Sequence, residues 1–147
     1  MFKRRAFLLF TLTVLAFAAI SASANDLPRG EWRLKSYNFQ QKIAFPIDKS
    51  TVTLNIKTGS LGGRSGCNIY SGGYSLAGGK LKVGGLVSTM MACEEPAMQF
   101  EQIFSSTMQN ATKFSIVDGV LTITEPKTGN FLRFERVLKR GKMHSSH

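Results

Sequence analysis

The stretch "GGRSGCNIYSGGYS", residues 62–75, holds five glycines, one of the chain's two cysteines and two of its three tyrosines. Such a run can cradle a phosphate, activate a thiolate or form a pair of strands. A phosphate loop needs a glycine turn that leads into a helix, whose first amides meet the anion. No helical pattern and no Gly-Lys-Ser/Thr follows here, so the phosphate interpretation is rejected.

A catalytic cysteine needs a nearby base, usually histidine, to hold it as a thiolate. The only histidines are His144 and His147, near the end of a polar tail that nothing fixes against Cys67 or Cys93. No Cys-x-x-Cys or His-x-x-x-His spacing indicates a zinc site. The sequence therefore predicts no thiolate nucleophile, no metal and no cofactor.

The carboxylates indicate no acid–base pair either. Glu94 and Glu95 are adjacent, and Glu101 and Glu125 look isolated on a helix and a strand. We therefore predict no catalytic residue, and a protein that is not an enzyme.

Residues 1–24 have the anatomy of a secretory signal peptide. Three cations precede "AFLLFTLTVLAFAAI", and small residues end the segment at "SASA". The apolar run of 15 residues is shorter than the roughly 20 that a membrane-spanning helix needs. We expect cleavage after Ala24 and a periplasmic or secreted protein. No cysteine follows the cleavage site directly to carry a lipid.

The mature chain is expected to be basic. Removing three of the 19 Lys and Arg leaves 16 against 9 Asp and Glu, a net charge of +7. Such a charge draws a protein to anionic membrane surfaces or acidic partners, although ordinary solubilising charge explains it equally well. Export argues against nucleic acid as a partner.

The two cysteines, Cys67 and Cys93, are expected to form a disulfide. An even pair in an oxidising compartment is more often bridged than free. Closing this loop of 26 residues would stabilise the fold by about 3 to 4 kcal/mol in the chain-entropy model.

Most of the remaining chain alternates apolar and polar residues, which is typical of half-buried strands. Turns are predicted at 77–79, at Asp118-Gly119 and at "PKTGN", residues 126–130, which gives a closing meander over 114–137. Residues 38–48 are interpreted as a long loop or an irregular edge strand. Shared buried faces are predicted for Trp32, Leu34 and Ser36, and for Val52, Leu54 and Ile56.

One segment, residues 95–112, has helical periodicity instead. Its apolar stripe predicts a helix packed on the sheet, and core packing explains the stripe without a ligand. The alternative is a ligand seam between helix and sheet at Phe100, Phe104 and Met108. The predicted stripe consists of Ala97, Phe100, Ile103, Phe104, Thr107, Met108 and Ala111.

Together these patterns predict an α+β, mostly β fold, in which a curled, half-barrel-like antiparallel sheet of about seven or eight strands packs on one α-helix. One domain is expected over residues 25–137, followed by a basic, disordered tail over 138–147.

The run "GRSGCNIYSGGYSLAGGKLKVGGLVSTMMAC", with "WRLKSY" before it and "FEQIF", "LTIT" and "FLRFERV" after it, resembles the META/HslJ domain family. The resemblance spans residues 30–137. It departs from the family at Met90, where a basic residue often stands.

The resemblance implies a curled sheet wrapped on a helix, similar to lipid-binding secretion pilot proteins. It also implies an exported, often envelope-associated protein with a heat-shock link, and it transfers no catalytic residue. Asn68 is expected to bond turn backbone, and the two tyrosines to pack across strands with their hydroxyls outward. The motif positions interpreted as framework are Gly66, Cys67, Asn68, Tyr70, Gly72, Tyr74, Thr89 and Cys93.

We therefore expect a non-catalytic, monomeric META-domain protein in envelope maintenance or stress tolerance. It would act by binding an envelope protein or an amphiphilic ligand. One alternative is an inhibitor of exported peptidases that presents the loop at residues 87–93. A thiol-dependent enzyme is the second alternative, and it requires a free cysteine.

Overall fold

The computed structural model describes residues 26–46 and 52–139. The predicted signal peptide, residues 1–24, and all but the first two residues of the predicted tail lie outside the described residues. Among the described residues, no helix has both the length and the apolar character needed to cross a membrane.

The described residues form ten strands and one helix. In chain order they are β1 (Gly30–Phe39), β2 (Lys42–Ala44), β3 (Thr53–Lys57), β4 (Ser60–Arg64), β5 (Ile69–Ala77), β6 (Lys80–Val83), β7 (Val87–Ser88), α1 (Glu95–Asn110), β8 (Lys113–Val117), β9 (Val120–Glu125) and β10 (Asn130–Arg136).

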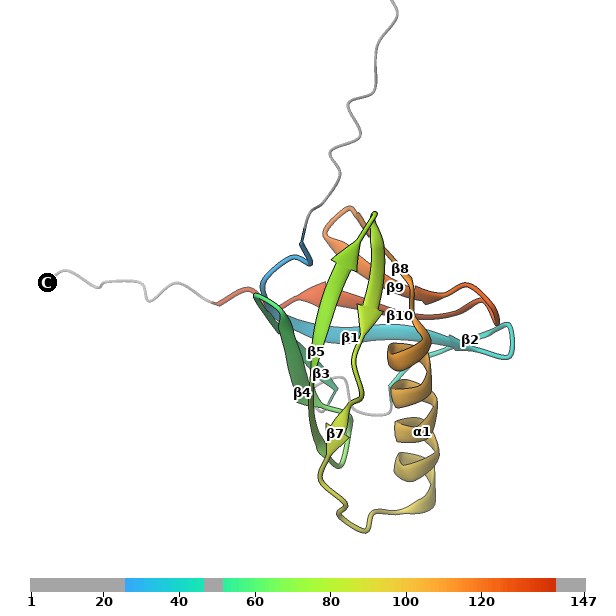
Figure 1. Cartoon of the computed structure of the whole chain (residues 1–147). Coiled ribbons are helices and arrows are strands. Elements are labelled where there is room, and N and C mark those ends of the chain that lie inside the picture. Colours follow the sequence, from blue (N-terminus) through green and yellow to red (C-terminus); the bar gives the residue numbers. More distant parts are fainter. Residues whose placement is uncertain (1–25, 47–51, 140–147) are drawn as a thin grey trace, which may run out of the picture.

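All strand pairings are antiparallel, and eight strands follow one another in the order β6-β5-β4-β3-β1-β10-β9-β8. β2 pairs with β1, and β7 pairs with β5. The two ends of the sheet nearly meet, because the Leu81 amide donates to the Thr112 carbonyl at 2.9 Å. Figure 1 shows α1 lying against this curled sheet. The predicted fold class is confirmed.

Strand β1 shows how the alternation builds the core. Trp32, Leu34 and Ser36 are buried, as the sequence predicts, and the charged residues between them are exposed. The register against β10 shifts between Leu34 and Ser36, where a β-bulge bends the strand. The first half of β1 pairs with β3 and the second half pairs with β2. This strand therefore belongs both to the curled sheet and to the β1–β2 hairpin.

The predicted turns at Gly78-Gly79 and Asp118-Gly119 are confirmed, and both residues of each turn have positive φ. The turn between β1 and β2 is made by Gln40-Gln41, with φ of 50° and 64°. Glutamine is not a typical turn residue, so the sequence does not predict this turn. It indicates only a long loop or an irregular edge strand over residues 38–48.

The glycine-rich stretch supplies the end of β4 and most of β5, and the register between these strands is unbroken from Ser60 to Arg64. Its glycines allow backbones to approach closely. A Cβ atom on Gly62 would lie 2.7 Å from the Tyr70 carbonyl oxygen, and one on Gly63 would collide with the carbonyl of Thr53. The stretch is thus part of a close-packed strand pair, which explains its glycines without a phosphate or any other ligand.

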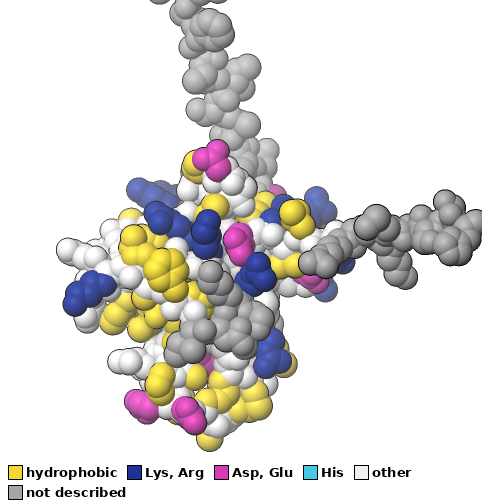
Figure 2. Space-filling view, turned by 180° about the vertical axis from the view of Figure 1, so that it is seen from behind, with side chains coloured by type: hydrophobic (Ala, Val, Ile, Leu, Met, Phe, Trp, Pro, Cys, Tyr) yellow, Lys and Arg dark blue, Asp and Glu magenta, His cyan; other side chains and the backbone are white. Residues whose placement is uncertain are grey.

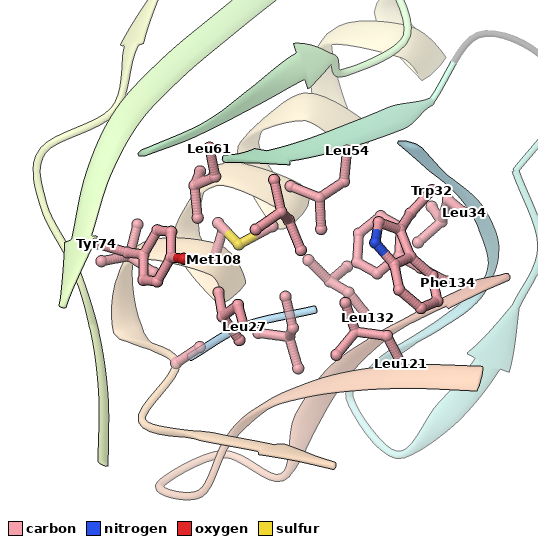
Figure 3. Packing of buried hydrophobic residues seen from close by; sticks show 14 of the residues in the cluster. Leu27, Trp32, Leu34, Leu54, Leu61, Tyr74, Met108, Leu121, Leu132 and Phe134 are labelled. Atoms are coloured by element: carbon pink, nitrogen blue, oxygen red, sulfur yellow. The ribbon is translucent and has the colours of Figure 1, made fainter. Parts of the chain in front are cut away.

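The core lies between the inner face of the sheet and α1 (Figure 3). Trp32, Phe134 and Met108 are among its largest fully buried side chains. The helix contributes Phe104, Thr107 and Met108, all from the predicted stripe. Burial of this stripe against the sheet confirms the predicted helix and the face it presents.

Candidate functional site

A cavity of about 670 Å³ opens where the first turns of α1 meet β1, the end of β4 and the chain on both sides of residues 47–51. This volume is in the range of small-molecule pockets. Its described lining residues are Tyr37, Phe45, Pro46, Val52, Arg64, Gly66, Cys67, Cys93, Pro96, Ala97, Gln99 and Phe100.

Aromatic rings form the apolar part of the cavity wall. Phe100 comes from α1, and its ring packs edge-on against Tyr37 of β1 with centroids 5.1 Å apart. Phe45, just after β2, is 65% exposed, although a phenylalanine is usually buried. The cavity therefore offers apolar surface that the described residues do not cover.

The two cysteines form another part of the wall. Cys67 and Cys93 lie at disulfide distance, with Cα atoms 6.4 Å apart, inside the usual range for a bridge. The bridge links the strand pair β4–β5 to the residues just before α1. Because these are the only cysteines of the chain, the bridged protein has no free thiol for nucleophilic chemistry.

Beside the cavity, the Glu101 carboxylate joins α1 to the glycine-rich stretch through four hydrogen bonds. Its Oε1 atom accepts from the Ser65 hydroxyl at 2.8 Å and from the amides of Cys67 and Asn68 at 3.2 and 2.6 Å. Its Oε2 atom accepts from the Asn68 side-chain amide at 2.6 Å. The prediction that Glu101 is isolated is wrong. Its hydrogen-bond partners could not be recognised from local sequence because they lie 33 to 36 residues away.

Asn68 extends this network to the loop that precedes the helix. Its Oδ1 atom accepts from the Thr89 hydroxyl at 2.9 Å and from the Met91 amide at 2.8 Å. The Thr89 hydroxyl oxygen in turn accepts from the Ile69 amide at 3.0 Å. Asn68 thus bonds loop backbone, and together with Glu101 it fixes three segments against one another.

The network also sets the protonation of its carboxylate. Partial burial alone would raise the pKa of Glu101, but the hydrogen bonds from Asn68, Ser65 and Cys67 outweigh it and lower the pKa below its ordinary value. A carboxylate with a lowered pKa, whose oxygens already accept four hydrogen bonds, is a poor general base. Its role in this geometry is structural.

The two motif tyrosines point into the protein, so the expectation that their hydroxyls face outward is wrong. The Tyr70 hydroxyl donates to the Thr53 carbonyl at 2.8 Å, and that of Tyr74 donates to Asp26. Burial raises the pKa of both phenols, and in Tyr74 the bond to Asp26 adds to it. Both stay protonated and hold strands together.

The predicted ligand seam is largely closed. Phe104 and Met108 are fully buried in the core, so neither side chain presents exposed surface to a ligand. Phe100 alone of the three lines the cavity. Glu125, the other carboxylate thought isolated, accepts from the Thr128 hydroxyl at 2.9 Å within the β9–β10 turn.

A second hollow of about 440 Å³ lies on the other side of Glu101, between the loop at residues 88–92 and the outer face of α1. Met90, Met91 and Met98 line it, and all three are exposed. In the described part of the chain, no three His, Cys, Asp or Glu side chains lie close enough to hold a metal ion.

Comparison with known proteins identifies the same fold. The META domain family model matches residues 25–137. No curated protein matches the sequence at a significant level.

Several solved structures are similar to this chain. A protein from Burkholderia xenovorans, solved by NMR, is 25% identical and superposes with a TM-score of 0.62, covering 74% of this chain and 82% of that one. A DUF4847 family protein from Bacteroides vulgatus is 12% identical, with a TM-score of 0.52 over 76% of this chain and 95% of that one. The second likeness concerns the fold alone.

Proposed function

The chain belongs to the META domain family, and from this premise we propose that it is an exported, non-catalytic binding protein that takes an amphiphilic ligand into the cavity at Tyr37, Phe45 and Phe100. Its place would be the cell envelope, in maintenance or stress tolerance. The observation that carries the proposal is the cavity itself, which combines a small-molecule volume with aromatic walls that no described residue covers.

The polar groups beside the cavity favour binding over catalysis. The Glu101 carboxylate is occupied by four hydrogen bonds, the hydroxyls of Tyr70 and Tyr74 are hydrogen-bonded, and the cysteines are paired. What remains at the cavity is apolar surface with a few polar side chains, the usual composition of a ligand pocket.

Export is supported by three features of the chain. The first 24 residues have the anatomy of a signal peptide, the two cysteines lie at disulfide distance, and the remaining chain is basic. An oxidising compartment would keep the Cys67–Cys93 bridge, and with it the cavity wall, intact.

Titration with N-phenylnaphthylamine, an uncharged apolar fluorophore, tests the proposal. We expect saturable fluorescence enhancement with one site per chain. Ala97→Trp, which fills the cavity from the helix, should weaken binding at least tenfold, a loss of about 1.4 kcal/mol. Gln109→Trp, on an exposed position of the same helix, is the matched control and should bind as the native protein does.

Two results would overturn the proposal. One is the absence of saturable binding by folded protein. The other is equal weakening by Ala97→Trp and Gln109→Trp, which would place the fluorophore outside the cavity.

A second candidate is the inhibition of exported peptidases by the loop at residues 87–93. The observation that favours it is a 97% exposed side chain, Met90, held between two fixed points, Thr89 and Met91. Inhibitors of this kind present a rigid exposed loop. Stoichiometric loss of peptidase activity in a panel assay, abolished by Met90→Asp, would support it, and full activity throughout would exclude it.

A further inference from the structure

We propose that the ligand of this cavity is a single-chain amphiphile with an anionic headgroup, whose head is held by Arg64 while its apolar chain lies against Phe45 and Phe100. This inference rests on the proposed function, because it names the class of ligand that the same cavity takes.

Charge complementarity selects the headgroup. Arg64 is the one charged residue among the described residues that line the cavity. The other polar side chains there are those of Gln99 and Tyr37, an amide and a hydroxyl that can both donate hydrogen bonds. A guanidinium with nearby donors suits a carboxylate or a phosphate, and its positive charge repels a cationic head.

Arg64 is placed by the strand that carries it. It is the last residue of β4, and its backbone amide donates to the Thr53 hydroxyl at 3.1 Å. The guanidinium forms no ion pair with any carboxylate in the described part of the chain, where the Arg33–Glu135 pair is the one salt bridge. An exposed cation that pairs with no described carboxylate, at the edge of apolar surface, is available for an anion.

Among the described residues, the nearby acidic side chains do not cancel this charge. Glu101 is engaged with Ser65, Cys67 and Asn68, and it lines the second hollow rather than this cavity. Glu94 and Glu95 are exposed at the start of α1 and do not line the cavity. In Figure 2 acidic side chains lie at the lower end of the molecule, the end at which the chain enters α1 in Figure 1, and also higher up among the basic side chains.

The size of the cavity indicates a single chain. A volume of about 670 Å³ suits one small molecule, not a patch of bilayer. The ligand would therefore be a monomeric amphiphile taken out of water or a membrane, with its chain against the aromatic rings and its head at Arg64.

Displacement of bound N-phenylnaphthylamine tests the inference with three amphiphiles of equal chain length, each below its critical micelle concentration. They are dodecanoate, dodecyltrimethylammonium and dodecyl maltoside. We expect dodecanoate to compete at least tenfold better than the cationic amphiphile. Its advantage should shrink as salt is raised, because Arg64 is exposed to screening.

Variants assign the preference to one residue. Arg64→Gln should weaken dodecanoate binding about tenfold, the size of one charge-assisted hydrogen bond, and leave dodecyl maltoside unchanged. Arg64→Lys should keep most of the preference, and Arg64→Glu should reverse it. Arg133→Gln removes an equal charge over the Phe131 ring, away from the cavity, and should change nothing.

The outcomes separate this inference from the proposed function. Equal competition by all three amphiphiles, or equal losses in Arg64→Gln and Arg133→Gln, would overturn the anionic headgroup while the cavity still binds the fluorophore. Failure of the uncharged fluorophore to bind would overturn the proposed function as well. Fluorophore binding that weakens as the protein concentration is raised would show that a second copy of the chain occupies the cavity, and would reject the amphiphile.

Discussion

Replacing Glu101 by glutamine should destabilise the fold by about 2 to 4 kcal/mol at neutral pH. The introduced amide side chain can keep a carbonyl oxygen opposite Ser65 and the two backbone amides, but its NH₂ group then faces the Asn68 side-chain NH₂ group, which now donates to Glu101 at 2.6 Å. Losing this bond costs about 1.5 to 3 kcal/mol, since the acceptor is charged. The three remaining bonds weaken because neutral acceptors bind less strongly than charged ones.

The cost of Glu101→Gln should also depend on pH, with a sign fixed by the lowered pKa. The folded protein holds the Glu101 pKa below its unfolded value, so in acid the unfolded state binds the proton first. The native carboxylate contributes its full stability above the unfolded pKa and loses it as pH falls through the folded pKa. The difference in the free energy of unfolding between the native protein and Glu101→Gln should therefore shrink on acidification.

Urea unfolding of both proteins between neutral pH and pH values below the ordinary glutamate pKa measures this difference. Glu31→Gln, at an exposed position of β1, is the matched control and should change the free energy of unfolding by no more than about 0.5 kcal/mol. A cost for Glu101→Gln no larger than that of the control, or one that stays constant with pH, would refute the structural role given to the carboxylate.

Three further predictions concern the framework around the cavity. Gly63→Ala should destabilise the fold by about 1 to 3 kcal/mol, because its Cβ collides with the Thr53 carbonyl, whereas Gly85→Ala, which enters open space, should be neutral in the same melts. Tyr70→Phe should lower the free energy of unfolding by about 1 to 2 kcal/mol, because the Thr53 carbonyl loses the hydrogen bond from the Tyr70 hydroxyl. Unchanged stability in thermal unfolding would contradict this hydrogen bond. Reducing the Cys67–Cys93 bridge should lower stability by about 3 to 4 kcal/mol and weaken fluorophore binding; labelling of either cysteine in native, unreduced protein would show that the bridge is absent.

The parts of the fold that local sequence determines could be predicted. Period-two alternation places Trp32 and Leu34 in the core, and Asp118-Gly119 marks a hairpin, because both signals depend on neighbouring residues alone. The Gln40-Gln41 turn could not be predicted, since pairing of β1 with β2 forces positive φ on residues that do not favour it.

The candidate site was harder to predict because it depends on contacts between distant segments. Phe45, Arg64 and Phe100 meet only after the sheet curls around the helix, and no local pattern relates them. Glu101 looked like an exposed helix residue because it lies off the apolar stripe. Its partners approach from the connection between β4 and β5, and the nearest signal was the Gly-Cys-Asn motif, whose free amides need an acceptor.

Amide chemical shifts of isotopically labelled protein, followed while N-phenylnaphthylamine or dodecanoate is added, locate the ligand residue by residue. We expect shift changes concentrated at the cavity wall, at Gly66, Cys67, Ala97, Gln99 and Phe100, with the sheet on the far side of the core unchanged. Changes confined to the second hollow at Met90, Met91 and Met98, or no changes at all, would contradict binding in the cavity.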